Sequence, residues 1–144
     1  MIRSTFLWYR ARNFFRNNPS SGSSYYNVSW LYTAQSTNET ITFAIQNNPS
    51  YTQIDDISVL YGTQQLIVNG GFENASQVGG SGANHLSTSN PNTGSYCYND
   101  GVVGSPDYVW QTFYTTPGAV LWVSFWIAWG GSGGGVYTNV TIYP

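Results

Sequence analysis

The sequence predicts an all-β protein, a jelly-roll β-sandwich built from about eight short strands. Apolar and polar residues alternate in several short segments, as in strands with one buried face. Glycine, proline and asparagine separate these segments, and no segment carries a convincing helix pattern. Charged residues make up only 7% of the 144 residues and aromatic residues 17%. This composition favours one packed domain over a disordered chain.

The expected strands follow one another along the chain with short turns between them. In residues 39–45, apolar side chains alternate with threonine, so the apolar set is expected to face the core. In the next strand, uninterrupted alternation would place Asp55 and Val59 on one face and Asp56 on the other. The expected strands are residues 4–11, 25–34, 39–45, 53–61, 65–73, 109–115, 120–129 and 136–144.

A segment of weak periodicity interrupts the strands between Asn74 and Tyr108. It is rich in glycine, serine and asparagine. We expect a loop here, and a loop of roughly 35 residues is longer than compact domains usually contain without a function.

Charge is distributed unevenly along the chain. There is no lysine, and all four arginines lie within the first sixteen residues, whereas all six acidic residues come later. A nucleic-acid-binding surface would need a broader basic area, so nucleic acid is not an expected partner. The arginines either protect an edge strand from aggregation or attract an acidic partner, such as another copy of the chain.

Catalytic chemistry has little support in this sequence. Cys97 and His85 are the only cysteine and histidine, so an internal disulfide and an ordinary zinc site are excluded. Asp55 and Asp56 are expected to point to opposite faces of a strand, which does not suit the facing carboxylates of a glycosidase. No phosphate-binding motif is present. We therefore expect no catalytic residues and no enzyme activity.

Four Asn-x-Ser/Thr sequons indicate an extracellular glycoprotein. No segment approaches the roughly 18 apolar residues of a membrane-spanning helix, and the first fifteen residues do not read as a signal peptide. If the protein is secreted, its signal lies outside this sequence. The sequon asparagines are Asn27, Asn38, Asn74 and Asn139.

Three segments resemble the galactose-binding-like jelly rolls, especially the carbohydrate-binding modules attached to xylanases and glucanases. LIVNGGFEN (66–74) resembles the opening strand, and VWQTFYTTPGAVLWVSFWIAW (109–129) the central hairpin. YTAQSTNETITFAIQNNPSYTQIDDISV (32–59) resembles the closing strands, which in that family follow the hairpin. Residues 1–62 therefore correspond to the C-terminal half of a jelly roll and residues 63–144 to the N-terminal half, together about one domain.

This inverted order has three explanations. The chain is a circular permutant, with residues 62–65 joining two neighbouring strands. Alternatively, it straddles two tandem modules of a longer protein. In the third, residues 1–62 of one copy complete residues 63–144 of the next, which produces a head-to-tail filament by strand addition.

The resemblance also implies a structural calcium ion where the first and last strands of the family meet. Its ligands here would be Glu73 and Asp55, with Asp56 in reserve, because carboxylate oxygens suit Ca²⁺. The alternative is that the two aspartates are turn or edge residues.

Two functions compete at this stage. The first is a non-catalytic extracellular structural or adhesive subunit that assembles with other copies of itself. The second is a module that binds polysaccharide by stacking sugars on exposed aromatic rings. The alternative is that these aromatic residues are buried or face a partner subunit. The candidate glycan-binding residues are Trp122, Trp126, Trp129, Tyr108 and Trp110.

Overall fold

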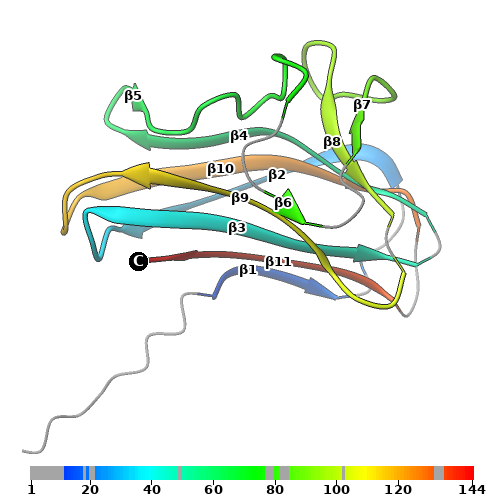
Figure 1. Cartoon of the computed structure of the whole chain (residues 1–144), viewed down its shortest axis with the longest axis horizontal. Helices are drawn as coiled ribbons and strands as arrows, with labels where there is room; N and C mark the ends of the chain where they lie inside the picture. Colours follow the sequence, from blue (N-terminus) through cyan, green and yellow to red (C-terminus); the bar gives the residue numbers. More distant parts are fainter. Residues whose placement is uncertain are drawn as a thin grey trace, which may run out of the picture.

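The computed structural model consists of two antiparallel β-sheets packed face to face, which confirms the predicted all-β sandwich (Figure 1). It describes residues 12–17, 19, 22–48, 50–76, 80–81, 85–101, 103–131 and 135–144. The strand expected at residues 4–11 lies outside these ranges. Among the described residues, no helix is long and apolar enough to span a membrane.

Most of the strands form where the alternating segments predict them. The first half of the chain forms β1 (Arg12–Asn17), β2 (Gly22–Thr33), β3 (Asn38–Asn47) and β4 (Thr52–Tyr61). The second half forms β5 (Gln64–Gln65), β6 (Gly80–Ser81), β7 (His85–Ser87), β8 (Cys97–Asp100), β9 (Asp107–Tyr114), β10 (Val120–Trp129) and β11 (Val136–Tyr143). The strands β6, β7 and β8 are short and fall in the segment that the sequence predicts as a loop.

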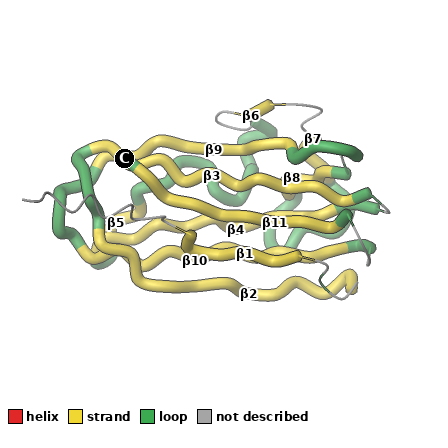
Figure 2. The backbone as a smooth tube through the Cα atoms, turned by 90° about the horizontal axis from the view of Figure 1, so that it is seen from below, coloured by secondary structure: helices red, strands yellow, loops and turns green. Residues whose placement is uncertain are grey.

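Strands from the two halves of the chain interleave in both sheets. One sheet has the order β1-β11-β3-β9-β6, and the other has the order β2-β10-β4-β8-β7, with β5 paired to β4. β10 thus lies between two strands of the first half, and β3 lies between two strands of the second half (Figure 2). Each half completes the other within one chain, so neither sheet requires an exchange of strands between copies.

An aromatic cluster fills the space between the sheets. The ring of Phe125 on β10 meets that of Phe43 on β3 edge to face, with centroids 5.0 Å apart. Phe14 and Trp30 also direct their rings toward Phe125, with centroid distances of 5.6 and 6.1 Å. Burying a side chain of this size contributes about 2–3 kcal/mol, so this cluster fixes β1, β2, β3 and β10 to one another.

A β-bulge in β4 reverses its alternation. Ser58 pairs with Ser124 of β10 and Asp55 pairs with Trp126. A step of three residues along β4 therefore corresponds to a step of two residues along β10. Asp56 has a φ of 49°, in the left-handed region, as expected of an extra residue in a bulge. Ile54 and Val59 are both fully buried although they are five residues apart. The predicted common face for Asp55 and Val59 is therefore wrong.

The chain leaves β4 through a hairpin to β5 and then crosses the side of the sandwich. The strand predicted at residues 65–73 ends at Gln65. Beyond it, the Ile57 N–H donates to the Gly70 carbonyl at 2.9 Å. A Cβ at Gly70 would lie 1.9 Å from the Ile57 oxygen, so only glycine fits this approach. The Gln111 side chain of β9 then pairs with both backbone groups of Val68, at 2.7 and 2.8 Å.

The turn between β2 and β3 is held by a buried carboxylate. The Glu39 side chain has no exposed surface and accepts hydrogen bonds from the Tyr32 hydroxyl and the Ser36 N–H, both at 2.9 Å. It also accepts the Gln35 N–H. Burial, and to a lesser extent the bond to Glu39, raises the pKa of Tyr32. Glu39 thus fixes the geometry of the turn by satisfying backbone donors that the ladder leaves free.

Candidate functional site

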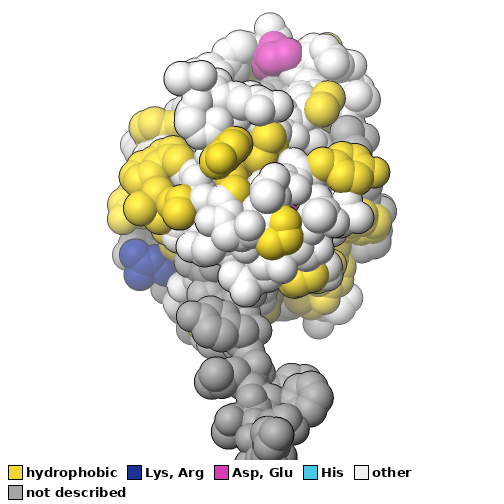
Figure 3. Space-filling model, turned by 90° about the vertical axis from the view of Figure 1, so that its left-hand side faces the viewer, with side chains coloured by type: hydrophobic (Ala, Val, Ile, Leu, Met, Phe, Trp, Pro, Cys, Tyr) yellow, Lys and Arg dark blue, Asp and Glu magenta, His cyan; other side chains and the backbone are white. Residues whose placement is uncertain are grey.

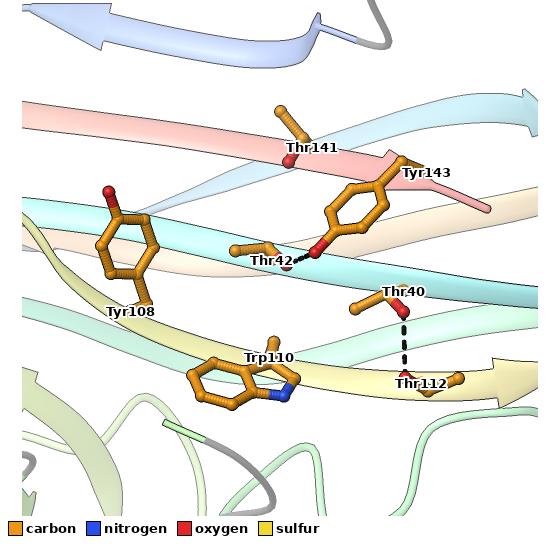
Figure 4. A pocket seen from close by; sticks show the side chains of 7 residues that line it. All are labelled: Thr40, Thr42, Tyr108, Trp110, Thr112, Thr141 and Tyr143. Carbon is orange, nitrogen blue, oxygen red and sulfur yellow. Dashed lines mark hydrogen bonds between the residues drawn. The ribbon is translucent and has the colours of Figure 1, made fainter. Parts of the chain in front are cut away.

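An open groove of about 630 Å³ runs over the outer face of the first sheet (Figure 4). Its side chains come from three neighbouring strands, β11, β3 and β9. The lining residues are Thr40, Thr42, Tyr108, Trp110, Thr112, Thr141 and Tyr143. None of these side chains is charged.

Strand alternation and register place these residues together. Thr42 of β3 lies between Trp110 of β9 and Thr141 of β11. One row further along the sheet, Thr40 lies between Thr112 and Tyr143. The intervening side chains, such as Ile41, point into the core and are buried. The core therefore holds the groove residues on an ordered platform rather than on a mobile loop.

The groove combines exposed rings with hydroxyl groups. The exposed fractions of Tyr108, Trp110 and Tyr143 are 41%, 36% and 46%. The Thr40 and Thr112 hydroxyl oxygens are 2.9 Å apart, and Thr42 donates to the Tyr143 hydroxyl at 3.4 Å. Aromatic faces can stack on an apolar C–H surface, while threonine and tyrosine hydroxyls can donate to and accept from a hydroxylated ligand.

The structure separates the five predicted glycan-binding aromatics. Tyr108 and Trp110 line the groove. Trp122 is 46% exposed but lies on the outer face of the opposite sheet, and Trp126 on the same strand is half-buried. Trp129 is only 8% exposed, and its indole N–H donates to the Thr138 hydroxyl at 3.1 Å. Trp129 is therefore a core residue and does not present its ring to a ligand.

Sequence reasoning missed the remaining groove residues. In the sequence, Thr40 and Thr42 are recognisable only as the polar residues that alternate with apolar ones in β3. Tyr143 lies more than a hundred residues from Thr42 along the chain, and only strand pairing brings the two together. The register of distant strands is set by the whole fold, so a local pattern could not indicate this neighbourhood.

The acidic pair on β4 converges on one loop. Asp55 accepts the backbone N–H groups of Asn92 and Thr93 at 2.8 and 3.2 Å. Asp56 accepts the side-chain amide of Asn92 at 2.8 Å and the hydroxyl of Thr93 at 2.6 Å. The expectation that the two carboxylates point to opposite faces is therefore wrong, because the left-handed conformation of Asp56 turns its side chain toward the same loop.

Glu73 approaches the same region from the crossing segment. Its carboxylate accepts the N–H groups of Ser95 and Tyr96 at 2.9 Å. A Cβ at Gly71 would lie 3.4 Å from an oxygen of Asp56 and 3.9 Å from one of Asp55. The three candidate calcium ligands thus gather around Gly71, although they come from both halves of the chain.

The present arrangement of these acids uses their oxygens as acceptors for loop N–H groups. Among the residues that the structure describes, no three His, Cys, Asp or Glu side chains are grouped so that they could hold a metal ion. Each carboxylate oxygen nevertheless has a second lone pair, and Gly71 leaves space beside Asp55 and Asp56. Calcium binding by Asp55, Asp56 and Glu73 therefore stays a prediction.

Burial also changes the acidity of two groups near this loop. Desolvation raises the pKa of Asp55 from its ordinary value of 3.8 to about 6, although the N–H groups that it accepts oppose the shift. Cys97 is fully buried, and burial raises the pKa of its thiol. A buried protonated thiol is a poor nucleophile. His85 lies in β7, and its side chain is outside the described part of the structure.

The four sequon asparagines differ in exposure. Asn27 on β2, Asn38 at the start of β3 and Asn74 after Glu73 are exposed. Asn139 on β11 is half-buried, and its side-chain oxygen is buried without a hydrogen-bond partner. The first three positions can therefore carry a bulky modification without disturbing the sheets.

Comparisons of the chain with family models, with curated proteins and with solved structures found no match. The class of the protein is therefore described from its fold and its groove alone. It is an all-β sandwich that presents an uncharged, aromatic groove on the outer face of one sheet.

Proposed function

We propose that the protein is a non-catalytic module that binds a neutral polysaccharide in the groove over β11, β3 and β9. The observation that carries this proposal is the convergence of Tyr108, Trp110 and Tyr143 around threonine hydroxyls on a rigid sheet. Aromatic rings supply stacking surfaces for the apolar faces of sugars, and the hydroxyls supply directional hydrogen bonds.

The chemistry of the groove favours an uncharged ligand. Among the described residues, no lysine or arginine lines it, so an anionic polysaccharide would find no cationic partner in this lining. The end of the molecule that Figure 3 shows likewise carries few charged side chains among exposed hydrophobic ones. The groove is open, so it suits the interior of an extended chain better than an enclosed chain end.

Affinity electrophoresis tests this proposal directly. The native protein is run in gels that contain neutral glucans, mannans or xylans, and in gels that contain anionic pectin or alginate. We expect retardation by at least one neutral polysaccharide and none by the anionic ones. Unretarded migration in every gel would refute the proposal, and retardation by the anionic polymers alone would contradict the neutral ligand class.

A structural or adhesive subunit is a second candidate, supported by a different part of the molecule. β2 is a twelve-residue strand at the end of its sheet (Figure 2), and within the described part of the chain one side of its backbone has no strand beside it, so that side offers an edge for pairing. Assembly of copies by strand addition would use this edge.

Light scattering distinguishes this second candidate. If β2 edges pair, unglycosylated wild-type protein should have a native mass of about twice the 15.9 kDa of one chain. The exposed Leu31 on β2 offers a test position, because a lysine at an edge strand opposes strand addition. Leu31→Lys should then restore the monomer mass. A wild-type monomer at all concentrations would rule this candidate out.

A further inference from the structure

One sequon lies at the end of the groove. Asn38 begins β3 and precedes the groove residue Thr40 by two positions, so both side chains project from the same face of the strand. The pairing with β9 continues the groove rows, because Thr40 lies opposite Thr112 and Asn38 lies opposite Tyr114. Asn38 is exposed, so its amide nitrogen is accessible at this end.

Tyr114 lies directly opposite Asn38 and presents an exposed aromatic ring. Its exposed fraction of 79% is the highest among the exposed large hydrophobic residues of the described chain. Side chains directly opposite each other on paired strands have Cβ atoms about 4.5–5.5 Å apart. The first sugar attached to Asn38 would therefore lie within reach of the Tyr114 ring, which is otherwise left facing water.

We propose that Asn38 carries an N-linked glycan whose first N-acetylglucosamine stacks on Tyr114 and whose following sugars cover the Thr40 end of the groove. The glycan would thereby limit the access of polysaccharide to Trp110 and Tyr143. This regulatory role rests on the proposed function of the groove, whereas the stacking on Tyr114 does not depend on it.

The modification is an ordinary group transfer. A bond forms between the Asn38 side-chain nitrogen and C1 of the sugar, and the bond between the sugar and the diphosphate of a lipid-linked donor breaks. The diphosphate departs with the electron pair, and the amide nitrogen loses one proton. The required Thr40 stands two residues after Asn38.

The other three sequons do not share this position. Asn27 lies on β2 of the opposite sheet, and Asn74 lies in the segment after Glu73. Asn139 is on β11 beside Ala44, but it is half-buried and its side-chain oxygen has no exposed surface. Only Asn38 combines exposure, the groove face and an opposite aromatic ring. Asn74 serves as the matched exposed control.

The first experiment measures occupancy and stacking on the chain secreted from a glycosylating eukaryotic host. Peptide mass spectrometry should find a glycan on Asn38. Tyr114→Ala should then lower the melting temperature of the glycosylated protein more than it lowers that of Asn38→Gln. An unmodified Asn38, or equal effects of Tyr114→Ala in both backgrounds, would overturn the proposal.

The second experiment measures access to the groove with the neutral polysaccharide that retards the protein most strongly. Asn38→Gln, and wild type trimmed enzymatically to its first sugar, should bind several-fold more tightly than untrimmed wild type. Asn74→Gln should bind as wild type does. Equal affinities for all four forms would overturn the regulatory role. If no form binds although Tyr114 and the Asn38 glycan are coupled, the proposed function fails and the stacking stands.

Discussion

The groove and the buried carboxylates use polar side chains in opposite ways. In the groove, the hydroxyls of Thr40 and Thr112 pair with each other and remain at the surface. By contrast, the carboxylates of Glu39 at the start of β3 and of Asp55 beside the bulge in β4 have no exposed surface, and their oxygens accept backbone N–H groups. The difference indicates that groove residues can change binding without changing stability, and that the carboxylates should do the reverse.

The largest effect is expected at Glu39. Glu39→Ala leaves the Tyr32 hydroxyl and the N–H of Ser36 without their acceptor, and buried unsatisfied donors cost about 1–3 kcal/mol each. We expect a loss of about 3 kcal/mol in the free energy of unfolding, measured with urea. Thr42→Ala, on the same strand but in the groove, should change it by less than about 0.5 kcal/mol. A larger loss in Thr42→Ala than in Glu39→Ala would break the comparison.

Calcium is the next test, because it would act on the carboxylates and leave the groove alone. An ion present at 100-fold above its dissociation constant stabilises the folded state by about 2.7 kcal/mol. We expect the melting temperature in calcium chloride to exceed that in EDTA, with magnesium as the control. Glu73→Gln should abolish the difference. Identical melting curves with calcium and with EDTA would show that Asp55, Asp56 and Glu73 do not hold this ion.

Two exposed tryptophans, one on each sheet, show which sheet binds the polysaccharide. Trp110→Ala removes a ring from the groove and should weaken binding of the neutral polysaccharide about tenfold, which corresponds to about 1.4 kcal/mol. Trp122→Ala removes a ring of similar exposure from the opposite sheet and should leave affinity unchanged. Affinity electrophoresis at graded polysaccharide concentration gives both values. Loss of binding in Trp122→Ala alone would show that the ligand binds to the opposite sheet.

The smallest effect is a pH dependence that comes from Asp55. Because its pKa rises from 3.8 to about 6 on folding, the folded state binds the proton more tightly over this interval. The contribution of Asp55 to stability is therefore greatest below about pH 4 and is lost as the pH rises through about 6. When the pH is raised from about 4 to about 7 in EDTA, the melting temperature of wild type should fall by a few degrees relative to that of Asp55→Asn. A rise relative to the variant would contradict this sign.

Much of the sandwich could be predicted because strand alternation is a local property. β3, β9, β10 and β11 form close to their expected residues. The faces of β4 could not be predicted, because a single left-handed residue, Asp56, reverses the alternation without changing the pattern of residue types. The strand expected at residues 65–73 does not form beyond Gln65. Instead, Gly70 allows the backbone to approach Ile57 of β4 closely within a turn, without a strand ladder.

The candidate site was only partly predictable. Tyr108 and Trp110 stand out as aromatics near a loop, but the sequence does not distinguish them from Trp129, which the structure buries. Thr42 and Tyr143 enter the site only through the pairing of β3 with β11. The loop that receives Asp55 and Glu73 was not predicted, and the calcium site that the family resemblance implies at these residues stays a prediction.

The central claim is that the groove is where ligand binds, and a titration followed by nuclear magnetic resonance tests it most directly. Each of the six tryptophans gives its own indole N–H signal. On addition of oligosaccharides from the best neutral polysaccharide, the signal of Trp110 should shift together with the backbone signals of β3, β9 and β11. The signals of Trp122 and the buried Trp129 should stay in place. Shifts confined to Trp122 and β2, or no shifts at saturating ligand, would contradict the account.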